Sequence, residues 1–306
     1  MTPDPGADTF ELIVKPLARR LTDHVRIGKV ASRTGKAASR TGSGTGTHTL
    51  GICGSQGSGK STLAHALTTF LSAQGLRCAS LSLDDLYLTH AERASLGREV
   101  HPLLQTRGVP GTHDVGLGLQ TLDALKAPGN VAIPRFDKSQ DDRFAIAEWP
   151  RTEAPVDVIV FEGWCVGARP QPDWMLAAPV NALERDEDPD GRWRAYVNHA
   201  LAGDYQTLFG RIDTLMFLQA PSFEVVHRWR REQEAALRRS IDGTATPRSA
   251  PLRTLSDADL MRFISHYERL TRWLLLEMPA RADVTVELGI NREVRAIHEG
   301  SSQPAC

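Results

Sequence analysis

The segment TLGICGSQGSGKS at residues 49–61 constrains the fold of this chain more than any other stretch. An apolar run leads into it and an amphipathic pattern follows it, so we expect a strand, a glycine-rich turn and a helix. The glycines let the backbone turn so that consecutive N–H groups point inward, where the start of the helix adds further donors. The sequence therefore predicts a nucleoside triphosphate site. The alternative is a glycine-rich turn that binds nothing.

Two side chains in this segment extend the prediction from phosphate to metal. Lys60 can reach the β- and γ-phosphates, and the Ser61 hydroxyl can ligate Mg²⁺. We therefore expect ATP and Mg²⁺ as cofactors. The nine residues that we assign to the nucleotide site are Gly54, Ser55, Gln56, Gly57, Ser58, Gly59, Lys60, Ser61 and Thr62.

Composition limits the partners of the chain. The 306 residues, of which 41% are apolar, can form one large domain or a domain with an appendage. A formal net charge of −1 favours neither nucleic acid nor an anionic membrane surface, so we expect no such partner; the oligomeric state stays open. The four cysteines are far apart and no secretory signal is visible at the N-terminus, which favours free thiols and a cytoplasmic location.

The ends of the chain differ in character from the middle. Apolar residues from Thr9 to about Ile27 have helical spacing, and residues 31–48 form a basic linker rich in Gly, Ser and Thr. We expect an arm over residues 1–48 that can be removed without loss of folding or catalysis, a main domain over 49–290, and a tail over 291–306. The tail is expected to fray from Arg295. Alternatively, three basic linker residues bind an anionic partner: Arg33, Lys36 and Arg40.

Strand and helix patterns alternate through the main domain, which predicts an α/β fold. Right-handed crossovers then give a mainly parallel sheet with helices on both faces, as in the P-loop NTPase fold, with ligands at the C-terminal ends of the strands. The strands expected after the phosphate loop lie at residues 78–83, 131–133, 156–161, 213–218 and 282–288.

Two carboxylates follow predicted strands and should converge on the phosphate loop. Asp84, after 78–83, is placed to accept a proton from an attacking hydroxyl; its alternative role is to cap a helix. Glu162, after the apolar run 156–161, is placed to hold Mg²⁺ or its water; its alternative is an ordinary surface glutamate. We assign catalytic roles to Asp84, Glu162 and Lys60.

A later helix, HRWRREQEAALRR, carries several arginines. One or two of them, from the segment Arg228 to Arg231, could close over the transferring phosphate as a cationic lid, because charge stabilisation strengthens when water is excluded. We assign Arg228 and Arg231 to that role. The alternative is a solvated basic face.

Other classes of nucleotide-binding protein are disfavoured by missing motifs. No N-K-x-D motif for guanine is present, the D-x-x-G string at 188–191 follows no predicted strand, and no LSGGQ-like signature occurs. These absences leave a kinase for a small hydroxylated molecule. The rival from another class is a regulator that uses ATP as a switch, but a switch needs no carboxylate on the acceptor side.

Motifs in order along the chain resemble those of the D-glycerate 3-kinases. They are GSQGSGKS (54–61), SLDDLYLTH (82–90), HPLLQTRGVPGTHD (101–114), IPRFDKSQDDR (133–143) and FEGWCVGARP (161–170). Uridine kinase, phosphoribulokinase and pantothenate kinase are similar at a greater distance. The resemblance covers about residues 49–288 and implies transfer of phosphate from ATP to D-glycerate, giving 3-phosphoglycerate. It places the catalytic base at Asp84, the E-G glutamate at Glu162, and the basic lid at Arg228–Arg231.

The same resemblance suggests where the acceptor binds. Arginine forks suit a small carboxylate and a lysine supplies a point charge, while neighbouring groups can position the hydroxyl. For Asp85 the alternative is helix capping. For the arginines, Lys138, His113 and Asp114 the alternative is hydrogen bonding that stabilises loops. The sequence departs from the family at 138–143, which is shortened, so another acceptor of the nucleoside, pantothenate or sugar type stays open. The acceptor-site candidates are Asp85, Tyr87, Arg107, His113, Asp114, Arg135, Lys138 and Arg143.

Overall fold

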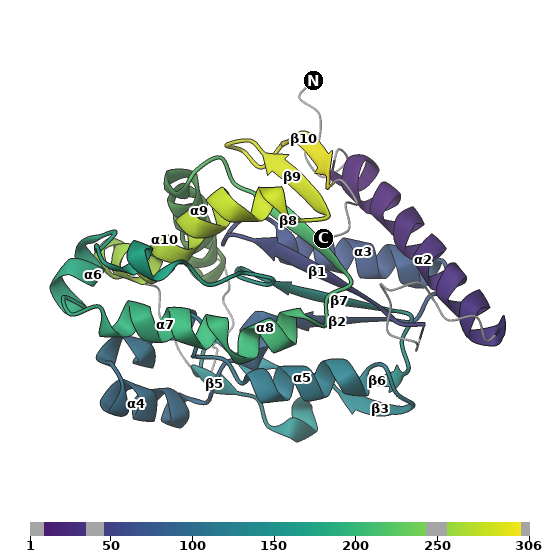
Figure 1. Cartoon of the computed structure of the whole chain (residues 1–306), viewed down its shortest axis with the longest axis horizontal. Helices are drawn as coiled ribbons and strands as arrows, with labels where there is room; N and C mark the ends of the chain where they lie inside the picture. Colours follow the sequence, from purple (N-terminus) through teal and green to yellow (C-terminus); the bar gives the residue numbers. More distant parts are fainter. Residues whose placement is uncertain (1–8, 35–45, 243–255, 301–306) are drawn as a thin grey trace.

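The fold is built around a six-stranded sheet (Figure 1). The computed structural model describes residues 9–34, 46–242 and 256–300. The strand order is β10-β9-β8-β1-β7-β2, in which neighbouring strands are parallel except for β10, which runs antiparallel to β9. The strands are β1 (His48–Gly54), β2 (Cys78–Ser82), β7 (Val158–Gly163), β8 (Thr214–Gln219), β9 (Val284–Leu288) and β10 (Val294–Glu299). The predicted α/β class and mainly parallel sheet are confirmed.

The register of the central strands determines where the site lies. Every residue of β7 is buried, as expected for a strand covered on both faces. Glu162 of β7 pairs with Ile52 of β1 on one side and with Ser82 of β2 on the other. The end of β2 and the end of β1 therefore lie beside Glu162, at the edge where parallel strands collect ligands.

Helices cover both faces of the sheet (Figure 1). One face packs Leu50 and Ile52 of β1 against α2, α3 and α9, and the other packs Phe161 of β7 against α5 and α8. None of the described helices combines the length and apolarity needed to cross a bilayer. The helices are α2 (Lys15–Thr34), α3 (Lys60–Ala73), α4 (His90–Glu99), α5 (Val115–Ala124), α6 (Ala182–Glu187), α7 (Arg192–Ala202), α8 (Asp204–Phe209), α9 (Phe223–Asp242) and α10 (Asp257–Glu277).

The N-terminal helix is part of the hydrophobic core. A π-helical turn, η1 (Phe10–Val14), leads into α2, and the buried side chains of Leu17 and Leu21 belong to the same cluster as Leu50 of β1. The helix continues to Thr34 and so takes up the start of the predicted linker. This packing argues against an arm that can be removed without loss. Residues 35–45, with Lys36 and Arg40, lie outside the described residues, as does the Arg33 side chain.

The expected fraying from Arg295 is wrong. Residues of β10 pair with β9 from Val294 to Glu299 and complete the edge of the sheet. A strand forms there because the turn at Gly289 brings the chain back alongside β9. Residues 301–306 lie outside the described residues.

Shorter elements connect the strands and helices of the main sheet. The strand expected at 131–133 is present as β3, but it pairs with β6 in a separate two-stranded ribbon. The acidic segment after residue 183 is an integral part of the fold, because buried Glu184 and Asp188 pair with Arg269 at 2.7 Å and Arg194 at 2.9 Å. The shorter elements are η2 (Leu83–Leu86), η3 (Pro102–Gln105), β3 (Gly129–Ala132), β4 (Phe136–Asp137), β5 (Asp142–Arg143), η4 (Ile146–Glu148), β6 (Arg151–Ala154), η5 (Asp173–Leu176) and η6 (Met278–Ala280).

Candidate active site

The phosphate loop lies between the end of β1 and the start of α3, as predicted. Gly59, the N-cap of α3, has φ +89°, and Gly57 has φ +80°. A Cβ at Gly57 would lie 2.7 Å from the Cβ of Trp229 on α9. Both backbone conformation and space therefore require glycine at position 57, and α9 packs directly against the loop.

A second contact holds the loop from the β9–β10 turn. Arg292 donates from Nε to the carbonyl of Gly57 at 2.6 Å, and its guanidinium lies 5.1 Å from the centre of the Trp229 ring. The Trp229 indole in turn donates to Ile290 at 2.7 Å. No sequence motif indicates this role for Arg292, since the contact joins segments far apart in the chain. These contacts tie the phosphate loop to the β9–β10 turn and to α9.

Three polar side-chain atoms around the loop are buried and have no hydrogen-bond partner in the described part of the chain. They are Oγ of Ser55, Oγ of Ser58 and Oε2 of Glu162. The other oxygen of Glu162 accepts from the Ser61 hydroxyl at 3.0 Å. Leaving such groups unpaired costs about 1–3 kcal/mol each, so a ligand that satisfies them is favoured. A hydroxyl next to a carboxylate supplies the hard oxygen ligands that suit Mg²⁺, and the serine hydroxyls suit phosphate oxygens.

Asp84 stands beside the phosphate loop at the end of β2. Its carboxylate accepts from Lys138 Nζ at 2.6 Å and from the Tyr87 hydroxyl at 2.9 Å, and its side chain is 27% exposed. Burial would raise the pKa of Asp84, but the charges of Lys138 and Lys60 outweigh that effect and hold the pKa below its usual range. The carboxylate is therefore ionised at neutral pH. Ser82 supplies the helix cap here, so Asp84 keeps its carboxylate for other contacts.

Asp85 points to a different neighbour from Asp84. Its two oxygens accept from Arg135 Nη1 and from the backbone N–H of Phe136, each at 3.1 Å. Burial raises the pKa of Asp85 more than Arg135 lowers it. This pair anchors the segment 134–136 next to the end of β2, which fits the loop-stabilising alternative for Arg135.

His113 lies one layer behind Asp84. Its Nδ1 lies 2.6 Å from the Tyr205 hydroxyl, and its ring stacks on Tyr87 with centroids 4.6 Å apart. Burial lowers the pKa of His113 to about 3, so the ring is neutral. His113 packs against Tyr87, and Tyr87 donates to Asp84. His113 therefore contacts Asp84 only indirectly, through Tyr87.

Asp114 and Arg143 bind each other. One oxygen of Asp114 caps α5 by accepting from Leu117 at 2.8 Å, and the other accepts from Arg143 Nη2 at 3.0 Å. Arg143 Nε also donates to the carbonyl of Tyr87 at 2.7 Å. These contacts match the loop-stabilising alternative for the two residues.

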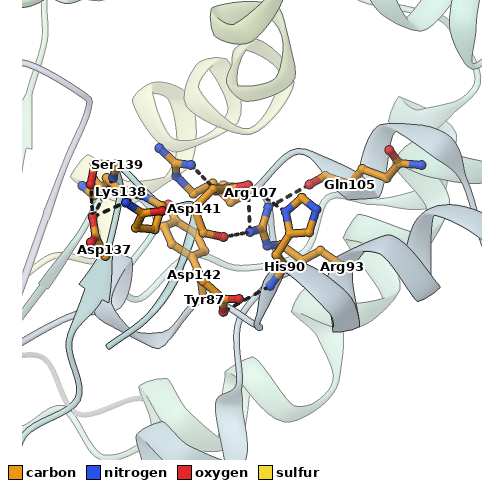
Figure 2. Close-up of polar contacts among 12 residues, drawn as sticks. Tyr87, His90, Arg93, Gln105, Arg107, Asp137, Lys138, Ser139, Asp141 and Asp142 are labelled. Atoms are coloured by element: carbon orange, nitrogen blue, oxygen red, sulfur yellow. Dashed lines mark hydrogen bonds and ion pairs between the residues drawn. The ribbon is translucent and has the colours of Figure 1, made fainter. Parts of the chain in front are cut away.

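Arg107 and Lys138 both contact carboxylates, and Figure 2 shows Arg107 close to Asp141. Lys138 bonds Asp84, whereas Arg107 bonds Asp141. Asp141 also pairs with Arg93 of α4. Neither Arg93 nor Asp141 is among the site residues predicted from the sequence. The only available signal was the dense run of charges in IPRFDKSQDDR, which does not indicate pairing.

The arginines of α9 face several directions. Arg228 pairs with Glu232 at 2.9 Å, Arg230 lies 5.8 Å from the ring of Phe263, and Arg231 is exposed. Among the described residues, no hydrogen bond or ion pair joins Arg228 or Arg231 to the Lys60, Ser61 and Glu162 group. The predicted lid role of Arg228 and Arg231 therefore has no such contact behind it among the described residues, and it stays a prediction.

Comparison with known proteins places this site in a family. The profile described as "Phosphoribulokinase / Uridine kinase family" matches residues 49–167. The kinase mug58 of Schizosaccharomyces pombe is 38% identical over 227 residues, which cover 71% of this chain and 77% of that protein. The chloroplastic D-glycerate 3-kinase of Arabidopsis thaliana is 33% identical over 229 residues, which cover 71% of this chain but only 45% of that protein.

A solved structure supports the same fold. The structure of D-glycerate 3-kinase from Cryptococcus neoformans var. grubii superposes with a TM-score of 0.67 at 24% identity, covering 92% of this chain and 99% of that one. Its likeness, together with the sequence matches and the phosphate loop at the end of β1, leads to one assignment. The chain belongs to the phosphoribulokinase/uridine kinase family of P-loop kinases.

Proposed function

We propose that this kinase transfers the γ-phosphate of ATP to a hydroxyl of a small acid, D-glycerate in the first instance, giving 3-phosphoglycerate. The observation that carries the proposal is the position of Asp84, an ionised and partly exposed carboxylate within the electrostatic reach of Lys60. A nucleotide switch has no use for such a group on the acceptor side. The Arabidopsis relative named as a D-glycerate 3-kinase supports this acceptor.

Phosphoryl transfer depends mainly on positioning and charge stabilisation. In the proposed reaction, Lys60 and the N–H groups at the start of α3 hold the phosphates. The acceptor oxygen bonds to the γ-phosphorus while the bond to the β-phosphate oxygen breaks and ADP leaves. Asp84 orients the acceptor hydroxyl and takes its proton as the new bond forms. Mg²⁺, held by Ser61 and Glu162, would neutralise charge that develops between the β- and γ-phosphates.

The acceptor carboxylate is proposed to bind Arg107, whose side chain is 25% exposed. Arg135, Arg143 and Asp114 have internal partners and support the walls of the site. A lid role for Arg228 or Arg231 stays a prediction. A cytoplasmic location also stays a prediction.

The acceptor is identified by a panel of hydroxy acids, nucleosides, pantothenate and sugar phosphates, each tested with Mg-ATP for acceptor-dependent ADP release. We expect the highest kcat/KM with D-glycerate, phosphorylation at the 3-hydroxyl by ³¹P NMR, and loss of turnover in Lys60→Ala. A nucleoside, pantothenate or sugar as the best acceptor would replace glycerate. No acceptor-dependent ADP release from any compound would favour the ATP-switch regulator instead.

A further inference from the structure

Asp141 is the centre of a charged cluster on the acceptor side of the site (Figure 2). It lies in the short turn between β4 and β5 and has φ +56°, an unusual value for a residue with a side chain. One carboxylate oxygen accepts from Arg107 Nη1, and the other lies 3.0 Å from Arg93 Nη2 and 3.3 Å from His90 Nδ1. Three residues from α4 and the following loop therefore meet at one carboxylate.

The two arginines of this cluster differ in their freedom. Arg93 is only 1% exposed and donates to the carbonyls of Leu88 at 3.1 Å, Gln105 at 2.8 Å and Asp141 at 2.6 Å. A buried guanidinium needs a counterion, and Asp141 supplies it. Arg107 is 25% exposed, and within the part of the chain that the structure describes its Nε and Nη2 groups have no protein acceptor. Arg107 therefore presents an open edge.

The positive charge of Arg107 is only partly neutralised within the cluster. Two guanidiniums share one carboxylate, and His90 adds charge only when it is protonated. Asp84 raises and Arg107 lowers the pKa of Tyr87, so Arg107 lies within electrostatic reach of the residue that donates to Asp84. The β4–β5 turn also carries Lys138, which bonds Asp84. One short turn thus positions a cation at Asp84 and an anion at Arg107.

We propose that Asp141 is a positioning residue. It accepts a hydrogen bond from Nη1 of Arg107 and thereby orients the Nε and Nη2 groups of Arg107 toward the carboxylate of the acceptor. The pair then selects a monoanionic hydroxy acid over an uncharged polyol of the same size. A guanidinium held on one side loses less freedom when it binds a second carboxylate in a two-point contact. This inference deepens the proposed function and rests on it.

Asp141→Asn is the sharpest variant, because asparagine has nearly the same shape and tolerates the same positive φ. We expect KM for D-glycerate to rise about 10-fold while kcat and KM for ATP change less than about twofold, since charge-assisted contacts to the acceptor weaken. Asp142→Asn is the matched control, because that neighbouring carboxylate accepts from the backbone N–H groups of His90 and Arg143. An Asp141→Asn enzyme with the wild-type KM overturns the proposal.

A double-mutant cycle tests whether Asp141 acts through Arg107. Arg107→Gln removes the guanidinium and leaves the Arg93–Asp141 pair in place, so this variant keeps the buried charge compensated. We expect Asp141→Asn to raise KM for glycerate no further in the Arg107→Gln background. Additive effects on KM would show that Asp141 acts elsewhere and would overturn the proposal.

The ratio of kcat/KM for glycerate to kcat/KM for glycerol tests the role of Arg107 separately from the proposed function. This ratio can also be measured if the Asp141→Asn variant does not fold. We expect Arg107→Gln, at an unchanged melting temperature, to lower that ratio about 10-fold or more; an unchanged ratio refutes the role of Arg107. If the wild type rejects glycerate but uses another hydroxy acid, the glycerate assignment fails and the same cycle is run with that acid. A wild-type enzyme that prefers uncharged acceptors contradicts both.

Discussion

Lys138 Nζ lies 2.6 Å from Asp84 Oδ2, so the carboxylate proposed as the catalytic base has a cation from the acceptor-side turn as its direct partner. The two residues come from different segments, the end of β2 and the turn after β4. Lys138 lowers the pKa of Asp84 and keeps it ionised, at the cost of making it a weaker base. This suits a reaction in which proton transfer follows the bonding change at phosphorus and the carboxylate mainly orients the hydroxyl.

Lys138→Met should move the acid limb of the kcat/KM profile to higher pH. Burial favours the protonated form of Asp84, and the charge of Lys138 opposes that effect, so its removal raises the pKa of the carboxylate. The profile is measured with saturating Mg-ATP. Lys126→Met, which removes a lysine between α5 and β3, is the control. An acid limb that stays in place would separate Lys138 from Asp84 ionisation.

Asp84→Asn should lower kcat by about 10²–10⁴-fold with little change in nucleotide affinity, because the amide can hold the hydroxyl but cannot take its proton. Steady-state kinetics and ATP titration measure the two effects. Asp85→Asn provides the contrast, since Asp85 anchors Arg135 and the Phe136 backbone, and it should affect stability more than kcat. A near-normal kcat in Asp84→Asn would remove the catalytic role.

Glu162→Gln should weaken the affinity for Mg²⁺ and so raise the Mg²⁺ concentration for half-maximal activity by about 10–100-fold. One oxygen of Glu162 bonds Ser61 and the other has no partner in the described chain, so the amide replaces a ligand charge in a site that otherwise keeps its shape. Magnesium titration at fixed ATP measures the change. Equal Mg²⁺ dependence in the variant would contradict a metal role for Glu162.

The free energy of unfolding should fall as the pH is lowered from about 6.5 toward 3. Burial lowers the pKa of His113 from 6.5 to about 3, so the unfolded chain binds a proton in this window that the folded chain does not. The loss amounts to about 1.4 kcal/mol per pH unit for one such histidine. His266 adds a similar loss down to its pKa of about 4.

Urea unfolding at several pH values tests this dependence. His113→Gln should flatten the slope below pH 6.5, whereas His65→Gln, at an exposed position on α3, should not change it. Equal slopes for wild type and His113→Gln would show that the buried ring does not control acid stability.

Leu21→Ala should lower the free energy of unfolding by about 2–5 kcal/mol, because it removes a fully buried side chain from the core shared by α2 and β1. Leu12→Ala, at a leucine that is 48% exposed, should cost less than about 1 kcal/mol. Denaturant titration gives both values. If Leu21→Ala costs no more than Leu12→Ala, the N-terminal helix is the removable arm that the linker composition suggested.

Sequence alone determined the architecture and the nucleotide half of the site. The glycines at 54, 57 and 59, together with Lys60 and Ser61, carry a local geometry that needs no distant partner. The apolar run before Glu162 indicates a strand buried on both faces, and parallel strands bring Asp84 and Glu162 to the same edge of the sheet. Local pattern and sheet topology were therefore sufficient for these positions.

Only the tertiary structure decided what the charged loop residues do. Arg143 was a candidate to bind the acceptor, but it pairs with Asp114. Arg107 pairs with Asp141 through Nη1 alone, so its Nε and Nη2 groups have no acceptor in the described part of the chain. Each such ion pair joins segments that are distant in sequence, and an arginine looks the same in the sequence whether or not its partner is present. Partner choice among charges depends on three-dimensional distance and burial, which is why the acceptor side could not be predicted from the residues alone.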